Sequence, residues 1–222
     1  MNSVVVKVGG SLALYPEKLR ALCTKLTEVS HKHKLIIVPG GGEFADVVRS
    51  LDTRFSLSCG ASHKMAILGM DQYGLLLSDL IPNSIVVSKL KEIKYSFEMG
   101  KLPIFLPSNL LLKDDQLENS WNVTSDAIAL YIANKLGTHQ VLLITDVDGI
   151  FSDDPKTHSH ARFIERLSAS ELLAMNKRTS VDETLSRLLL KSHITCVVVN
   201  GLFPERVITI LDGQPAVCTL IT

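Results

Sequence analysis

The sequence lacks the features on which secreted, disulfide-bonded and membrane-spanning proteins depend. Its four cysteines are widely scattered and form no CxxC pair, which predicts reduced thiols in place of a disulfide framework. The first residues, MNSVVVKVGG, carry no signal-peptide pattern, and no apolar run approaches the ~20 residues that a membrane helix needs. We therefore expect a cytoplasmic protein with no membrane partner.

An excess of charge of one sign is also missing. Lysine plus arginine and aspartate plus glutamate both number 23, so the formal net charge is zero, and no basic stripe is present that would attract nucleic acid. The Walker A pattern GxxxxGK[ST] and the dinucleotide-binding pattern GxGxxG are absent as well. We therefore expect a small-molecule partner and no nucleic-acid partner.

Aliphatic residues, by contrast, are abundant. Hydrophobic residues make up 46% of the 222 residues and aromatic residues only 5%, a profile typical of buried parallel strands with helices on both faces. Strand-like runs alternate with helical patterns, which predicts an α/β fold: a three-layer αβα sandwich with a mainly parallel sheet. The expected strands are 3–8, 34–38, 84–87, 141–145 and 194–199, and the expected helices begin near Pro16, cover about 61–80 and 124–136, and begin again at Pro204.

The chain is expected to form a single domain over residues 1–222, because it shows neither an internal repeat nor a low-complexity linker. Within it we expect an amino-terminal lobe of about residues 1–118 and a carboxy-terminal lobe of about residues 119–222. The polar stretch KDDQLENS (113–120) is the candidate boundary, and an ordinary surface loop explains it equally well.

The first candidate site follows the first expected strand, in VVVKVGGS (4–11). Lys7 lies near the carboxyl end of that strand, and the chain then turns through Gly9, Gly10 and Ser11. Adjacent glycines let the backbone approach a ligand closely and point N–H groups at phosphate oxygens, while a lysine screens the charge of a transferred phosphoryl group. A tight turn between a strand and a helix is the alternative explanation.

A second run of glycines follows the next expected strand, in LIIVPGGGEFAD (35–46). Gly40, Gly41 and Gly42 interrupt any regular element, which is typical of a place where backbone and ligand nearly touch. The helix that opens at Glu43 points free N–H groups and the positive end of its dipole at an anion. Because ligands of open α/β sheets bind at the carboxyl edge, we expect the two turns to face each other there.

A helix start supplies the third candidate. Thr124, Ser125 and Asp126 open an apolar helix, where they either cap the helix or, in the functional interpretation, place Asp126 so that its carboxylate pairs with Lys7 and orients it.

The fourth candidate is the loop after the strand at 141–145, TDVDGIFSDDPK (145–156). Such a loop offers backbone groups to a purine, and carboxylates to ribose hydroxyls or hydrated magnesium. A hairpin built on Asp148-Gly149 is the alternative.

The motifs KVGGS, PGGG, VTSDAIA and ITDVDGIFSDDP, in this order and spacing, resemble the amino acid kinase family over nearly the whole chain. The resemblance implies ATP with Mg²⁺, in-line transfer of the γ-phosphoryl group without a covalent enzyme intermediate, a homo-oligomer, and an acceptor lobe followed by a nucleotide lobe. It implies catalytic roles for Lys7 and Asp126. The implied phosphate-binding residues are Gly9, Gly10, Ser11, Gly40, Gly41 and Gly42, and the implied nucleotide-binding residues are Thr145, Asp146, Asp148, Gly149, Ile150, Phe151, Asp154, Pro155 and Lys156.

Stretches 40–49, 61–74 and 198–207 resemble the branch of that family that converts (5-(aminomethyl)furan-3-yl)methyl phosphate to its diphosphate in methanofuran biosynthesis. That acceptor has an ammonium group at one end and a phosphate at the other, so acidic side chains and Arg, His or Lys are both expected around it. Other acceptors (UMP, isopentenyl phosphate, an acyl amino acid) and a non-catalytic nucleotide- or oxyanion-binding protein are the alternatives. The expected acceptor-binding residues are Glu43, Arg49, His63, Asn122 and Thr124, with Asp46 and Asp71 as further candidates for the ammonium group and Lys64 as a further candidate for the phosphate.

Two other patterns are interpreted structurally. His158 and His160 form an HxH pair without a third ligand at a suitable spacing, so we expect a solvated loop and no metal site built by the protein. Ser168–Glu171 and Ser180–Glu183 have the spacing of capping boxes at the start of helices.

Overall fold

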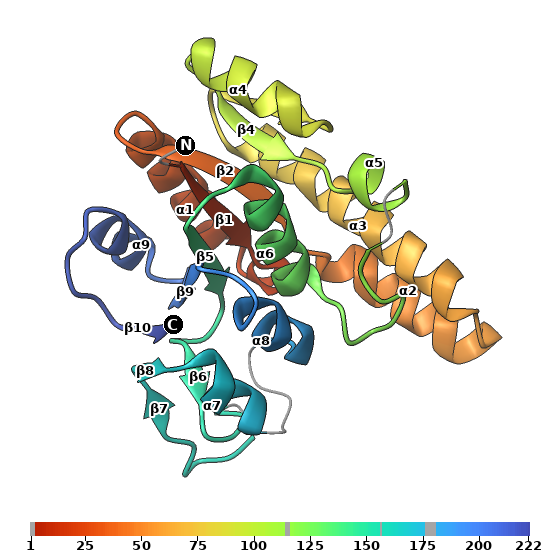
Figure 1. Cartoon of the computed structure of the whole chain (residues 1–222). Coiled ribbons are helices and arrows are strands. Elements are labelled where there is room, and N and C mark those ends of the chain that lie inside the picture. The colour runs from red at the N-terminus through yellow and green to blue at the C-terminus, as the bar shows by residue number, and fades with distance from the viewer. Residues whose placement is uncertain (1–2, 114–115, 156, 176–180) are drawn as a thin grey trace.

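The computed structural model describes residues 3–113, 116–155, 157–175 and 181–222. In these residues an eight-stranded sheet has the order β3-β4-β2-β1-β5-β9-β10-β8, and β6 and β7 form a separate antiparallel pair (Figure 1). Neighbouring strands of the large sheet are parallel except β9 and β10. The strands are β1 (Ser3–Val8), β2 (Lys34–Pro39), β3 (Ser84–Val87), β4 (Leu102–Phe105), β5 (Gln140–Thr145), β6 (Ile150–Phe151), β7 (Phe163–Ile164), β8 (Arg166–Leu167), β9 (Thr195–Asn200) and β10 (Cys218–Ile221).

Helices cover both faces of this sheet, as the alternation of strand-like and helical patterns predicts. The expected three-layer α/β fold is therefore confirmed. The helices are η1 (Gly10–Leu14, a short 3₁₀ helix), α1 (Pro16–Ser30), α2 (Gly42–Phe55), α3 (Cys59–Leu80), α4 (Leu90–Glu98), α5 (Ser108–Leu111), α6 (Ser125–Leu136), α7 (Ala169–Ala174), α8 (Glu183–Leu189) and α9 (Pro204–Leu211).

The alternation of side chains along β1 decides which residues face which helices. Val6 and Val8 belong to the core that α1 and α9 cover, whereas Val5 belongs to the core that α6 and α8 cover. Because successive side chains of a strand point to opposite faces, Lys7 points to the same face as Val5, which is the face of α6. The strand thus places a charged side chain in a layer that is otherwise aliphatic, and the alternation of side chains along the strand determines that it faces α6.

The helix that carries Asp126 is bounded by local signals. The hydroxyl of Thr124 accepts a hydrogen bond from the backbone N–H of Asp126, and Gly137 ends α6 in the left-handed conformation with φ of 65°. The helix expected at 124–136 is confirmed with these caps. The capping box at Ser168–Glu171 is confirmed too, whereas Ser180 lies outside the described residues and Asp182 is the N-cap of α8.

The sheet runs without a break through both expected lobes, because β1 pairs with β5 in parallel register. The lobe boundary stays a prediction, and residues 114 and 115 of the stretch KDDQLENS lie outside the described residues. In the part of the chain that the structure describes, no helix is both long enough and apolar enough to cross a membrane.

Candidate active site

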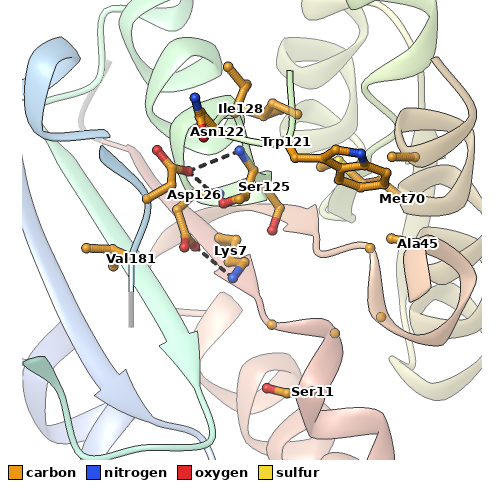
Figure 2. Close-up of a pocket in the computed structure, with 18 of the residues that line it drawn as sticks. Lys7, Ser11, Ala45, Met70, Trp121, Asn122, Ser125, Asp126, Ile128 and Val181 are labelled. Atoms are coloured by element: carbon orange, nitrogen blue, oxygen red, sulfur yellow. Dashed lines mark hydrogen bonds and ion pairs between the residues drawn. The ribbon is translucent and has the colours of Figure 1, made fainter. Parts of the chain in front are cut away.

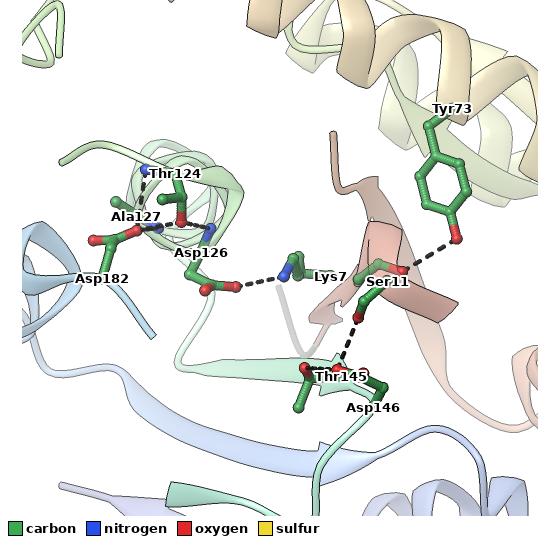
Figure 3. Close-up of polar contacts among 10 residues, drawn as sticks. Lys7, Ser11, Tyr73, Thr124, Asp126, Ala127, Thr145, Asp146 and Asp182 are labelled. Carbon is green, nitrogen blue, oxygen red and sulfur yellow. Dashed lines mark hydrogen bonds and ion pairs between the residues drawn. The ribbon is translucent and has the colours of Figure 1, made fainter. Parts of the chain in front are cut away.

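Lys7 and Asp126 meet between the sheet and α6. Asp126 lies in the first turn of α6, where the helix dipole favours a carboxylate. Lys7 Nζ lies 2.7 Å from Asp126 Oδ1, and the two side chains are only 10% and 9% exposed (Figure 3). The expected pairing of these side chains is therefore present, as a nearly buried ion pair at the carboxyl end of β1.

The two glycine turns touch each other directly at this edge of the sheet. A methyl group added at Gly10 would lie 2.0 Å from the backbone nitrogen of Gly42, and one added at Gly40 would lie 2.5 Å from that of Gly10. The N–H groups of Gly9 and Gly40 donate to carbonyls of the neighbouring strands at 2.8 Å each. Side chains do not fit between the turns, so the contact between the turns itself requires glycine.

A cleft of about 640 Å³ extends from the glycine turns to α2, α3 and the start of α6, and on its other side to α7 and α8. Lys7, Asp126 and the backbone of both turns line its middle part, between Val181 on one side and Trp121 on the other (Figure 2). No side chain of the described residues caps the N-terminus of η1 or of α2, so N–H groups at both helix starts are free to bind an anion. Of the six residues expected to bind phosphate, five line the cleft, and Gly40 instead packs beneath Gly10.

Two further contacts hold the first glycine turn in place. The hydroxyl of Ser11 donates to Asp146 Oδ1 at 2.9 Å, which ties the turn to the end of β5 (Figure 3). The hydroxyl of Tyr73, on α3, donates to the carbonyl of Gly9 at 3.2 Å. Burial raises the pKa of Tyr73, so this phenol stays a donor at every physiological pH.

Asp182 is a site residue that the sequence analysis missed. Its carboxylate accepts hydrogen bonds from the backbone N–H and hydroxyl of Thr124, at 3.1 and 2.6 Å, and from the N–H groups of Ala127 and Leu185, at 3.1 and 2.7 Å. One carboxylate therefore joins the N-termini of α6 and α8 and fixes the helix turn that carries Asp126. The sequence signal that could have identified Asp182 as a helix cap is its position directly before an apolar helix.

The environment of Asp182 changes its ionisation. Burial, with a contribution from the charge of Asp126, raises the pKa of Asp182 from 3.8 to about 6, although the hydrogen bond from Thr124 opposes the shift. Two carboxylates thus lie close together in the wall of the cleft, and only Asp126 is paired with Lys7.

The expected acceptor residues all line the cleft, but several are already engaged. Thr124 donates to Asp182, and Arg49 forms an ion pair with Asp46 at 2.5 Å. Glu43 lies in the first turn of α2, and His63 is 6% exposed in α3. Asn122 lies at the rim, in the segment before α6. Lys64 and Asp71 do not line the cleft. The carboxylate of Asp71 instead accepts hydrogen bonds from the N–H and hydroxyl of Ser108 at the start of α5.

Trp121 also lines the cleft and was not assigned a role from the sequence. Figure 2 shows its indole on the same side of the cleft as Ala45 and Met70, which belong to α2 and α3. The segment before α6 thus folds back over the amino-terminal helices, an arrangement with no local sequence signal.

The loop expected to bind the nucleotide does not line this cleft and lies farther along the same sheet edge. Asp148 is bound by Asn200 at 3.0 Å and paired with Arg206 at 2.5 Å. The structure also shows that Asp148-Gly149 is not a hairpin tip, because β6 pairs with β7 across residues 152–162. Thr145 ends β5 and Asp146 directly follows it. Gly149 packs on Thr219, Ile150 is buried, and the ring of Phe151 lies 5.4 Å from that of Phe163. The carbonyl of Asp154 accepts a hydrogen bond from the backbone N–H of His158, Pro155 follows Asp154, and Lys156 lies outside the described residues.

Three features together are typical of a small-molecule phosphotransferase: a mainly parallel sheet between two layers of helices, a nearly buried lysine–carboxylate pair, and two touching glycine turns at the carboxyl edge of the sheet. Comparison with known proteins gives the family. The model of the amino acid kinase family matches residues 2–200, and the chain belongs to this family.

Among its relatives, a protein from Methanocaldococcus jannaschii named [5-(aminomethyl)furan-3-yl]methyl phosphate kinase is 38% identical over 217 residues, which cover 98% of this chain and 96% of that protein. A uridylate kinase from Pyrococcus abyssi is 25% identical, with 95% of this chain and 96% of that protein covered. The molybdenum storage protein subunit beta of Azotobacter vinelandii is 27% identical, with 100% and 86% covered.

The fold recurs in solved structures. A uridylate kinase from Archaeoglobus fulgidus superposes with a TM-score of 0.79 at 23% identity, over 99% of this chain and 100% of that chain. These relationships agree with the site, and the chain is a kinase.

The contact between the glycine turns predicts that Gly10→Ala separates them. The added methyl group meets backbone atoms of Gly42 at 2.0 and 2.2 Å, which cannot be relieved by a side-chain rotation. We expect a free energy of unfolding lower by about 1–3 kcal/mol and a loss of most phosphoryl transfer. Urea unfolding and a coupled assay of ADP release measure the two effects. Gly60→Ala, where an added methyl meets nothing within 4 Å, is the matched control, and equal effects at both positions would refute the interpretation.

The raised pKa of Asp182 predicts a pH-dependent stability. The folded protein binds this proton more tightly than the unfolded chain, so the contribution of the group is most favourable below its ordinary pKa of 3.8 and is lost as the pH rises to about 6. The unfolding free energy of the wild type minus that of Asp182→Asn should fall over this interval and stay level above it. Urea unfolding at several pH values measures the difference. A constant offset over the whole range would reflect only the altered hydrogen bonds and would contradict the shifted pKa.

Proposed function

We propose that the protein transfers the γ-phosphoryl group of ATP to (5-(aminomethyl)furan-3-yl)methyl phosphate and so forms its diphosphate. One observation carries the proposal: a single cleft holds Lys7 and the glycine turns, which suit phosphate groups, together with the carboxylate of Glu43 and the indole of Trp121, which suit a ring with an ammonium group. The relative from Methanocaldococcus jannaschii, similar along nearly the full length of both chains, supports this acceptor.

In the proposed reaction an oxygen of the acceptor phosphate attacks the γ-phosphorus of ATP. The bond between that phosphorus and the β,γ-bridging oxygen breaks, and ADP leaves with the electron pair. Lys7 holds a positive charge beside the transferred group, and Asp126 fixes the position of the ammonium group of Lys7. The N–H groups at the starts of η1 and α2 bind the phosphate oxygens, so the residues act by positioning and charge rather than by a covalent intermediate.

The nucleotide is proposed to lie at the same sheet edge on the carboxy-terminal side, along residues 145–155, next to the bond between Ser11 and Asp146. Mg²⁺ would neutralise charge on the nucleotide phosphates. The described residues hold no group of three or more His, Cys, Asp or Glu side chains that could bind a metal.

A second candidate acceptor is UMP, because several relatives about 25% identical are uridylate kinases. The glycines of this chain are followed by Glu43-Phe-Ala-Asp46, without the Asn and Arg-Gly typical of those enzymes, which favours the aminomethylfuran phosphate. A role limited to binding is disfavoured, because a binding protein does not need a buried Lys7–Asp126 pair, whose desolvation is costly.

The acceptor assignment predicts a preference within a defined panel. ADP release should be fastest with the aminomethylfuran phosphate and slower with UMP, isopentenyl phosphate and acetylglutamate, because the cleft offers both a phosphate end and an acidic, aromatic end. Phosphorus NMR of the product should show a new diphosphate. Faster turnover of UMP would replace the proposed acceptor, and no ADP release with any of the four would overturn the kinase assignment.

The buried ion pair predicts that stability and catalysis can be separated. Lys7→Met leaves Asp126 buried and uncompensated and should lower the unfolding free energy by about 3–5 kcal/mol, together with a loss of turnover by at least about a hundredfold. The double variant Lys7→Met/Asp126→Asn removes both charges and should recover much of the stability but none of the activity. Urea unfolding and ADP release measure both. Activity that returns with stability in the double variant would exclude Lys7 from catalysis.

A further inference from the structure

Trp121, the single tryptophan of the chain, is held in a fixed orientation by α2. Its indole N–H donates to Asp52 Oδ2 at 2.7 Å, and the guanidinium carbon of Arg49 lies 4.9 Å from the ring centroid. Arg49 is in turn paired with Asp46 at 2.5 Å. A ring held by a hydrogen bond at its edge and a cation over one face cannot turn freely, so its surface toward the cleft has a defined position.

The distance along α2 sets which part of an acceptor reaches this ring. Arg49 is seven residues beyond Gly42, or about 10 Å along the helix axis. With the γ-phosphoryl group at Lys7 and the glycine turns, the acceptor phosphate lies next to it and the esterified ring lies beyond, toward Trp121, while the charge of Arg49 is engaged with Asp46 and the indole. This part of the wall is accordingly better suited to the ring of an acceptor than to its phosphate.

The neighbouring wall is apolar. Ala45, Ile67 and Met70 line the same cleft, and Figure 2 shows Ala45 and Met70 on the side of the indole. Aliphatic side chains and an aromatic surface together form a slot for a flat apolar group, because aromatic rings and thioethers pack well on such groups.

We propose that Trp121 is the aromatic platform of the acceptor site and selects phosphate monoesters of a flat ring. Asp52 and Arg49 are positioning residues that act through the indole. The inference rests on the proposed kinase function, and it adds the residue that recognises the ring. An acceptor with an aliphatic chain in place of the ring gains no stacking on the indole and is bound less tightly.

The experiment uses the indole itself as the reporter. Because the chain has one tryptophan, a change in its fluorescence on addition of the aminomethylfuran phosphate without ATP reports binding at this residue. We expect a saturable change at acceptor concentrations near the KM of the wild type. Isopentenyl phosphate, which has no ring, should give a weaker signal that requires higher concentrations.

Variants separate recognition of the ring from a structural role. Trp121→Leu should raise KM by about tenfold with a smaller change in kcat, and Trp121→Phe, which keeps an aromatic surface, should restore much of the affinity. Asp52→Ala should raise KM and shift the emission of the indole. Tyr95→Leu, which removes an exposed aromatic ring from α4, is the matched control and should leave KM unchanged.

The outcomes distinguish the platform from the acceptor assignment. If the wild type prefers UMP, and Trp121→Leu still raises KM about tenfold, the platform stands and the proposed acceptor falls. If the aminomethylfuran phosphate is the substrate but KM and fluorescence do not respond at Trp121, the platform is refuted and the proposed function stands. A preference for isopentenyl phosphate refutes both.

Discussion

The ion pair between Lys7 and Asp126 is the interaction around which the site is arranged. It joins the first strand to α6 and places two opposite charges in a layer made mostly of aliphatic side chains. Such a pair is costly to desolvate, and the dipole of α6 together with the turn fixed by Asp182 offsets part of that cost. A lysine held in this way faces the cleft with its charge already in position, which is what stabilisation of a transferred phosphoryl group requires.

A second constraint is the contact between Gly10 and Gly42, which brings the two glycine turns together at the edge of the sheet. Because the turns touch, the starts of η1 and α2 lie side by side, and both line the cleft next to Lys7. From there the cleft extends along α2 and α3 toward Trp121 on one side and to α7 and α8 on the other. The proposed phosphate chemistry and the proposed ring recognition thus share one cleft, which the contact between the glycines helps to shape.

Membership of the family identifies the type of reaction, whereas the acceptor depends on other residues. A uridylate kinase shares the fold of this chain at 23% identity, so the fold alone does not decide what is phosphorylated. The acceptor residues proposed for this chain lie on α2, on α3 and in the segment before α6. These are surfaces where a few side chains change recognition without disturbing the strands that hold Lys7.

The sequence by itself determined the elements whose signals are local. The aliphatic runs predicted β1, β3 and the core of β2, β5 and β9, and Thr124 and Gly137 marked the ends of α6. The strand β4 was missed because Pro103 interrupts a pattern typical of an interior strand. The tertiary structure was needed to show that the two glycine turns, expected only to face each other, are in direct contact, that Asp182 caps two helices, and that Trp121 lies over α2. Each of these joins segments far apart in the chain, and periodicity and capping report only on neighbours along it.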